Sequence, residues 1–137
     1  MHPILRAFVA GFAATLLFHQ VVFAAFYLAG MAPAAPFNMT PTPPLGVPAV
    51  ISLAFWGGVW GIPIWLLIRS SSGASYWAKA AAFGALGPSL VALALVFPLK
   101  GGAFMAGWDP KIIVGALILN AAWGIGLALF MRWPKPG

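Results

Sequence analysis

The chain has 137 residues, of which 63% are apolar and only 6% are charged. So few polar residues cannot cover the surface of a soluble globule, which leaves a membrane as the solvent. The formal net charge of +6 comes from basic residues scattered singly along the chain, and this spacing excludes a continuous basic stripe for nucleic acid.

Four uncharged apolar stretches follow one another, at 7–29, 49–68, 80–99 and 112–131. Each has about the 20 residues that a helix needs to cross a bilayer. Their polar residues are too sparse for a soluble amphipathic helix, and the alternation typical of a membrane β-strand is absent. The sequence therefore predicts an all-α membrane protein, a single-domain four-transmembrane-helix bundle with helices at about 5–29, 48–69, 77–99 and 111–132.

The first predicted helix begins near Arg6 and carries two neighbouring polar residues, His19 and Gln20. A basic residue before an apolar run also fits a signal peptide, but the run at 7–29 is longer than the roughly 7 to 15 residues of a cleavable segment. We therefore expect a membrane span. At about 1.5 Å per residue, His19 lies roughly 20 Å from Arg6.

The connection at 30–47 is uncharged and rich in proline. Proline favours extended conformations and lowers the entropy of the unfolded chain. The segment therefore predicts an ordered cap over the outer end of the bundle, with a solvent-exposed connector as the alternative. Its prolines are Pro33, Pro36, Pro41, Pro43 and Pro44, with Pro48 adjoining.

Small residues predict how the helices pack, because close approach of backbones holds membrane spans together. Packing inside the bundle is expected, and a homodimer face at 55–61 is the alternative. Pro63 and Pro88 lie within the second and third helices and predict kinks. The packing positions are Gly11 in the first helix, Gly57 and Gly61 in the second, Gly84 in the third and Gly124 in the fourth.

An internal repeat relates the two halves of the chain. Residues 60–69 match residues 123–132 in the frame W-G-I-x-[IL]-x-L-x-x-R, and Gly11 and Gly84 each follow a basic residue by five positions. The repeat predicts two tandem helical hairpins, related as parallel repeats about an axis along the membrane normal. The alternative is chance similarity between two segments of apolar composition.

The basic residues also predict orientation by the positive-inside rule. One group lies at both termini and in the middle connection, while the other end of the bundle holds Lys100, Asp109 and Lys111. Both termini are therefore expected in the cytoplasm of a multi-pass membrane protein. The first group is Arg6, Arg69, Lys79, Arg132 and Lys135.

Polar and aromatic side chains in the outer half of the bundle are the candidates for a ligand-binding cluster, since a desolvated polar group tends to face the bundle interior. Such a cluster would place His19 and indole rings around a small molecule such as a quinone or tetrapyrrole. Interhelical hydrogen bonds that fix the order of the helices are the alternative. The cluster comprises His19, Gln20, Ser89, Asn120, Trp56, Trp60 and Trp123.

Missing residue types limit the chemistry. Asp109 is the single acidic residue and cysteine is absent, so the chain cannot form paired carboxylates, metal clusters or thiolates. We expect no catalytic residue, no metal and no cofactor. The predicted function is a non-catalytic accessory or structural subunit that contacts the lipid bilayer and associates with itself or a larger membrane complex. The alternative is a small transporter, pore or lipid- or quinone-binding protein with a pocket near His19 under the proline-rich loop.

The stretch from Thr40 to Gly61, together with Phe18-His19-Gln20, resembles a set of small four-helix bacterial inner-membrane proteins. The resemblance covers most of the chain and implies a location and a helix count, but no active residues. The chain differs from the small four-helix multidrug exporters, which place a glutamate in the first span, and from disulfide-generating four-helix oxidoreductases, which need cysteines.

Overall fold

The structure is a computed structural model that describes residues 1–32 and 34–132. The predicted all-α class is confirmed, because the described residues form four helices that are long and apolar enough to cross a membrane. The loop residue Pro33 and the topology signal Lys135 lie outside the described residues. The four helices are Pro3–Leu28, Ala49–Ile68, Gly73–Leu99 and Pro110–Arg132.

The first span contains a wider turn. It consists of α1 (Pro3–Ala14), the π-helical segment η1 (Thr15–His19) and α2 (Gln20–Leu28). Just before η1, the carbonyl oxygen of Gly11 accepts hydrogen bonds from the Thr15 backbone N–H, the Thr15 hydroxyl and the Trp123 indole. Three donors compete for one carbonyl group, which weakens the regular helical bond at the point where the helix widens.

The third span has a similar interruption near its far end. It consists of α4 (Gly73–Val91), the π-helical segment η2 (Ala92–Val96) and the short α5 (Phe97–Leu99). Pro98 lacks an N–H and its ring obstructs the carbonyl four residues earlier, within η2. By contrast, Pro63 and Pro88 lie inside continuous stretches of α3 (Ala49–Ile68) and α4.

The third span also begins earlier than the expected start near residue 77. Lys79 does not mark the beginning of α4, because its side chain reaches back toward the connection and its Nζ donates to Ser71 Oγ at 2.9 Å. Tyr76, in the first turn of α4, is fully buried and its hydroxyl donates to the Ala128 carbonyl at 2.6 Å. The added turn is therefore fixed by packing against α6 (Pro110–Arg132).

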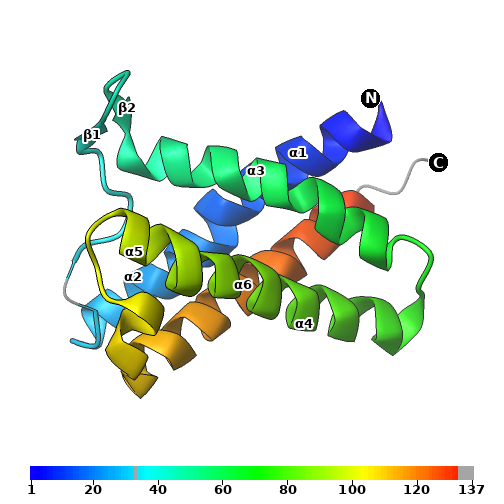
Figure 1. Ribbon diagram of the computed structural model, residues 1–137. Helices are drawn as coiled ribbons and strands as arrows, with labels where there is room; N and C mark the ends of the chain where they lie inside the picture. The colour runs from blue at the N-terminus through cyan, green and yellow to red at the C-terminus, as the bar shows by residue number, and fades with distance from the viewer. Residues whose placement is uncertain (33, 133–137) are drawn as a thin grey trace.

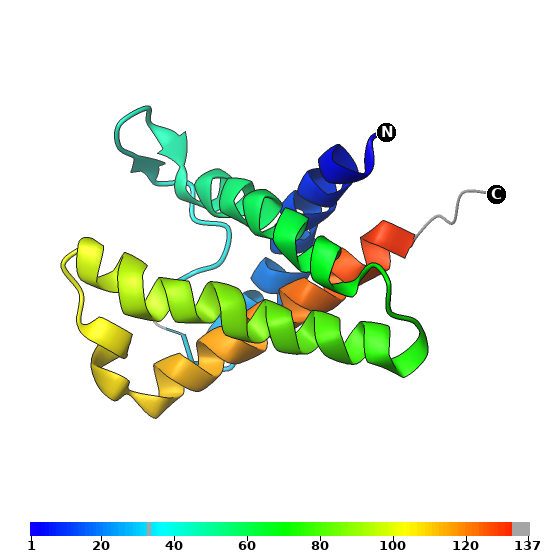
Figure 2. The ribbon, with the colours of Figure 1, turned by 45° about the vertical axis from the view of Figure 1, so that its right-hand side comes forward.

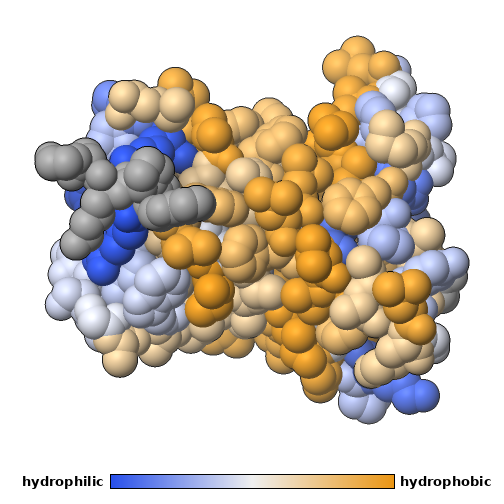
Figure 3. Space-filling model, turned by 180° about the vertical axis from the view of Figure 1, so that it is seen from behind, coloured by the Kyte–Doolittle hydropathy of each residue, from blue (hydrophilic) through white to orange (hydrophobic). Residues whose placement is uncertain are grey.

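The helices form two crossed pairs, with α1 beside α3 and α4 beside α6 in both views of the ribbon (Figures 1 and 2). A further contact joins α1 to α6. The start of α1, the α3–α4 connection and the end of α6 lie at one end of the molecule, and the α5–α6 connection lies at the other (Figure 1). Seen from behind, a hydrophobic belt crosses the middle of the molecule, and more hydrophilic areas lie toward both ends (Figure 3).

The buried core is built largely from small residues, which let the helix backbones approach closely. At the crossing of α1 and α3, a Cβ added at Gly61 would lie 2.6 Å from the Ala7 carbonyl oxygen and 3.2 Å from Gly11 Cα. At the crossing of α4 and α6, a Cβ added at Gly84 would lie 2.9 Å from Gly124 Cα. Neither crossing has room for a side chain unless the helices move apart.

The proline-rich connection contains strands that the sequence did not predict. Strands β1 (Pro41–Thr42) and β2 (Val47–Pro48) pair antiparallel, with Thr42 opposite Val47. The Thr42 hydroxyl donates to the Val47 carbonyl at 2.7 Å and closes this short hairpin. The hairpin leads directly into α3 and projects at the end of the molecule opposite the start of α1 (Figure 1).

Candidate functional site

Two residues of the predicted cluster, His19 and Gln20, are bonded to each other, and Gln20 also binds the proline-rich connection. The Gln20 amide nitrogen donates to His19 Nδ1 at 3.1 Å, and the Gln20 Oε1 accepts the Phe37 backbone N–H at 2.7 Å. Gln20 is buried and is the first residue of α2, directly after the π-helical turn. Its amide therefore uses its oxygen and its nitrogen to join a helix, a histidine and a loop.

A second pair, Ser89 and Asn120, joins α4 to α6. The Asn120 Nδ2 donates to Ser89 Oγ at 2.8 Å, and Ser89 Oγ donates to the Ala116 carbonyl at 3.2 Å. Ser89 is buried. Among the described residues, no hydrogen bond links this pair to His19 or Gln20. The structure thus distributes the predicted polar cluster over two separate networks.

The three tryptophans of the predicted cluster also occupy different surroundings. Trp123 is buried and its Nε1 donates to the Gly11 carbonyl at 3.0 Å, from α6 across to α1. The Trp60 ring lies against α4, where a Cβ added at Gly87 would be 3.2 Å from it. Trp56 is 57% exposed on the outside of α3 and packs edge-on against Phe55. Each of the three indoles therefore has different neighbours.

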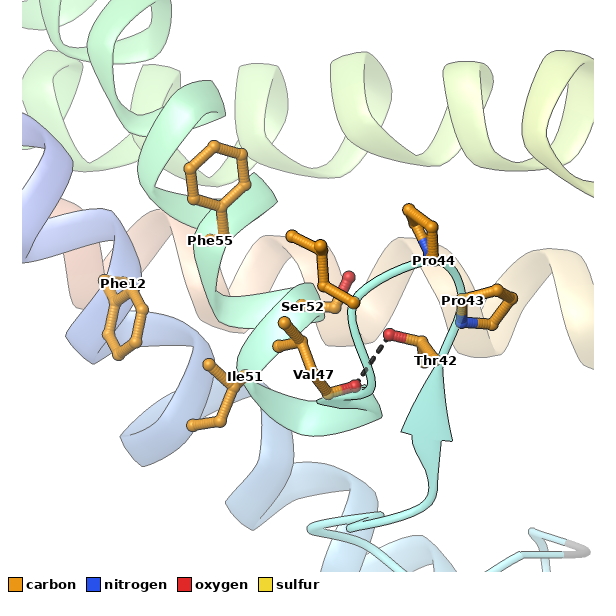
Figure 4. A pocket seen from close by; sticks show the side chains of 9 residues that line it. Phe12, Thr42, Pro43, Pro44, Val47, Ile51, Ser52 and Phe55 are labelled. Carbon is orange, nitrogen blue, oxygen red and sulfur yellow. Dashed lines mark hydrogen bonds between the residues drawn. The ribbon is translucent and has the colours of Figure 1, made fainter.

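A groove of about 390 Å³ lies beneath the β1–β2 hairpin (Figure 4). It is open between the hairpin and the helices α1 and α3, and apolar side chains and prolines form most of its wall (Figure 4). None of the seven predicted cluster residues lines it. The groove is lined by Phe12, Thr42, Pro43, Pro44, Leu45, Val47, Ile51, Ser52 and Phe55.

One part of this groove could be expected from the sequence. The uncharged prolines indicated an ordered segment over the outer end of the bundle, and the hairpin now forms one wall of the groove. The contribution of Phe12 was missed, because a phenylalanine in an apolar span has no feature that distinguishes a groove wall from a lipid contact. Within residues 1–32 and 34–132, no three His, Cys, Asp or Glu side chains gather as a metal site would require.

No family model matches the chain, and neither the curated proteins nor the solved structures give a significant match to it. The resemblance to small four-helix bacterial inner-membrane proteins therefore depends on the segment from Thr40 to Gly61 and on Phe18-His19-Gln20 alone.

Proposed function

We propose that the protein is a non-catalytic accessory or structural subunit that associates with itself or with a larger complex in a membrane. The observation that carries this proposal is the use of the polar side chains inside the spans. Gln20, Ser89 and Trp123 each make hydrogen bonds that join one part of the chain to another. Such bonds stabilise a fixed arrangement of helices rather than a translocation path, in which polar groups line a wet cavity.

The exposed face of α3 is the surface we assign to a partner. Phe55 and Trp56 lie side by side there, and they are 46% and 57% exposed, with their rings in an edge-to-face contact at 5.3 Å between centroids. Aromatic side chains of this kind are enriched in the centres of protein interfaces. This supports association through α3, at the first two residues of the homodimer face expected at 55–61.

The test is native mass spectrometry of the protein extracted gently from its own membrane. We expect a stable complex with a second protein or a second copy, and we expect Trp56→Ala to weaken it. Trp77→Ala is the matched control, because Trp77 is a partly exposed indole on α4. A lone monomer in every gentle detergent would overturn the proposal, as would equal loss of the complex in both variants.

We also propose that the chain consists of two tandem hairpins. The repeat equates Gly61 with Gly124, and the two crossings have the same register. A Cβ at Gly61 would contact the carbonyl of Ala7, and a Cβ at Gly124 would contact the carbonyl of Ala80. Each added Cβ would also lie near a glycine of the facing helix. The distance is 3.2 Å from the Gly61 Cβ to Gly11 Cα and 3.3 Å from the Gly124 Cβ to Gly84 Cα.

The contacts of the two repeat tryptophans further support the duplication. Trp60 of the first hairpin lies against α4 of the second, and Trp123 of the second lies against α1 of the first. A two-fold relation between hairpins produces such an exchange. The test is an experimental structure in lipid. Superposition of the hairpins by one rotation about an axis along the membrane normal is expected, and the absence of any rotation relating Trp60 to Trp123 would overturn the duplication.

For location and orientation we propose the bacterial inner membrane, with both termini in the cytoplasm. Support comes from the positive-inside rule, because Arg6, Arg69, Lys79 and Arg132 belong to the end of the molecule opposite the hairpin. Of the lysines and arginines that the structure describes, only Lys100 and Lys111 belong to the hairpin end, where they accompany Asp109.

A second candidate function is the binding of a lipid or quinone, and the groove under the hairpin favours it. Phe12, Ile51 and Phe55 offer an apolar wall to such a molecule. In this version the bound group lies beside Phe12 rather than beside His19. A quinone or lipid that remains bound during native mass spectrometry, and that is lost on Phe12→Ala but not on Phe83→Ala, would support it.

A further inference from the structure

Basic side chains from two helices meet at the α3–α4 connection, at the end of the molecule away from the hairpin. The Arg132 guanidinium lies over the Tyr76 ring, with its Cζ 3.3 Å from the ring centroid, and its Nη2 donates to the Ser71 carbonyl at 2.6 Å. Lys79 Nζ donates to the hydroxyl oxygen of the same serine at 2.9 Å. Arg132 of α6 and Lys79 of α4 are therefore neighbours that share Ser71.

A third cation, from α1, lies close to this pair. The Arg6 Nη2 donates to the Phe130 carbonyl at 3.4 Å, two residues before Arg132 in α6. Three positive side chains thus lie near the start of α1, the start of α4 and the end of α6. The chain's single acidic side chain, Asp109, belongs to the α5–α6 connection at the opposite end. The two oxygens of Ser71 that hold Lys79 and Arg132 are uncharged, so they orient the cations without neutralising them.

We propose that Lys79 and Arg132, with Arg6 beside them, bind the phosphate group of an anionic phospholipid. An ammonium has three donors and a guanidinium five, so donors remain on both after their bonds to Ser71. Arginine and lysine are the side chains that bind phosphate best. The buried Tyr76 ring fixes the guanidinium before binding, which lowers the entropy lost when an anion binds.

The surroundings favour a lipid as the source of the phosphate. The three cations lie near the ends of helices that are long and apolar enough to cross a membrane, at the start of Pro3–Leu28, the start of Gly73–Leu99 and the end of Pro110–Arg132. Trp77, one residue after Tyr76, is 37% exposed on α4 and is of the type that lies at the level of lipid headgroups. A headgroup bound between Arg6 and Lys79 would also connect the first span to the third.

The experiment uses the full chain in neutral detergent, with native mass spectrometry as the readout. Phosphatidylglycerol is titrated against phosphatidylcholine, which has the same phosphate but no net charge. We expect phosphatidylglycerol to bind more tightly, and Lys79→Gln to weaken its binding about fivefold, as expected for the loss of one cation at a lipid surface. Arg132→Gln should weaken it by at least as much.

Lys111→Gln is the matched control, because it removes one lysine charge at the opposite end of the molecule. Lys79 is exposed, so its substitution leaves the packed core unchanged even if Arg132→Gln fails to fold. Equal binding of the two lipids, or equal loss in Lys79→Gln and Lys111→Gln, would overturn the proposal. Displacement of phosphatidylglycerol by millimolar inorganic phosphate would overturn the assignment to a lipid and identify free phosphate as the ligand.

Discussion

Gly124 lies where α4 and α6 are in close contact, and it illustrates how single residues set the packing of this chain. A Cβ at this position would collide with the Ala80 carbonyl and would lie 3.3 Å from Gly84 Cα. Both neighbours are backbone atoms, so the helices themselves must move apart. We expect Gly124→Ala to lower the free energy of unfolding by about 1 to 3 kcal/mol, measured by thermal or SDS unfolding in detergent.

Gly115 provides the matched control on the same helix, because a Cβ added there has nothing within 4 Å. Alanine also has the higher helix propensity, by roughly 1 kcal/mol. Gly115→Ala should therefore leave the unfolding midpoint unchanged or raise it. Equal destabilisation by the two substitutions would show that close contact between α4 and α6 is not what Gly124 provides.

Tyr76 allows one buried hydrogen bond to be tested while the ring stays in place. Its hydroxyl donates to the Ala128 carbonyl at 2.6 Å, and its ring carries the Arg132 guanidinium. Tyr76→Phe removes only the hydroxyl, so we expect a loss of about 1 kcal/mol in the free energy of unfolding. Tyr27→Phe is the control, because Tyr27 is 43% exposed and its hydroxyl makes no hydrogen bond within the described part of the chain. A loss of the same size in Tyr27→Phe would contradict this explanation.

Counting residues in the sequence predicts depth along a helix, but it does not predict the direction of a side chain around the helix. The depth of His19 follows from counting residues, but its partner depends on the angle at which the side chain leaves the helix axis. The π-helical turn at Thr15–His19 turns the following residues relative to a regular helix, by about 100° for one extra residue. Gln20 therefore faces the connecting loop, where it binds Phe37, rather than Asn120.

At the scale of the elements, one side chain of the first span binds the proline-rich connection. Gln20 Oε1 accepts the Phe37 backbone N–H, whereas the hairpin further on is closed by its own bonds, such as Gly46 N–H to the Thr42 carbonyl at 2.8 Å. Gln20→Met keeps the length of the side chain and removes the acceptor. A hydrogen bond worth about 1 kcal/mol slows the hydrogen exchange of its donor amide about fivefold. We therefore expect the Phe37 amide to exchange about fivefold faster in this variant.

The Gly46 amide is the internal control for that exchange measurement. Its rate should stay constant in Gln20→Met, because its acceptor lies in the same hairpin. Unchanged exchange at Phe37 would show that Gln20 does not hold the loop. Acceleration at both amides would show that the connection and the hairpin open as one unit.

The hairpin itself could not be predicted from the sequence. Each strand has only two residues, and three of the six residues from Pro43 to Pro48 are proline, which cannot donate to a strand ladder. Composition indicated order in this segment, and nothing in the local pattern indicated pairing. The groove beneath it depends on how the hairpin meets Phe12 of α1, a contact between residues that are far apart in the sequence.

At the scale of the whole molecule, hydropathy was sufficient for the four spans. The penalty for unpaired backbone groups in lipid leaves helices as the simplest solution for apolar runs of this length. Consecutive spans must alternate in direction, so consecutive connections lie at opposite ends of the molecule. Because the number of spans is even, both termini lie at the same end. Accordingly, the start of α1, the α3–α4 connection and the end of α6 lie at one end of the molecule (Figure 1). Which end faces the cytoplasm depends on charge alone, and that remains a prediction.

The absence of cysteine from the chain makes this orientation directly measurable, because every introduced cysteine is a unique label. Ser72 and Ala103 are exposed residues in the connections at opposite ends of the molecule. With a membrane-impermeant maleimide on spheroplasts, Ala103→Cys should react at once, and Ser72→Cys only after the membrane is permeabilised. Leu45→Cys, at the 85% exposed tip of the hairpin, should react like Ala103→Cys. The reverse pattern would invert the orientation, and reaction of both connections in sealed cells would contradict four complete spans.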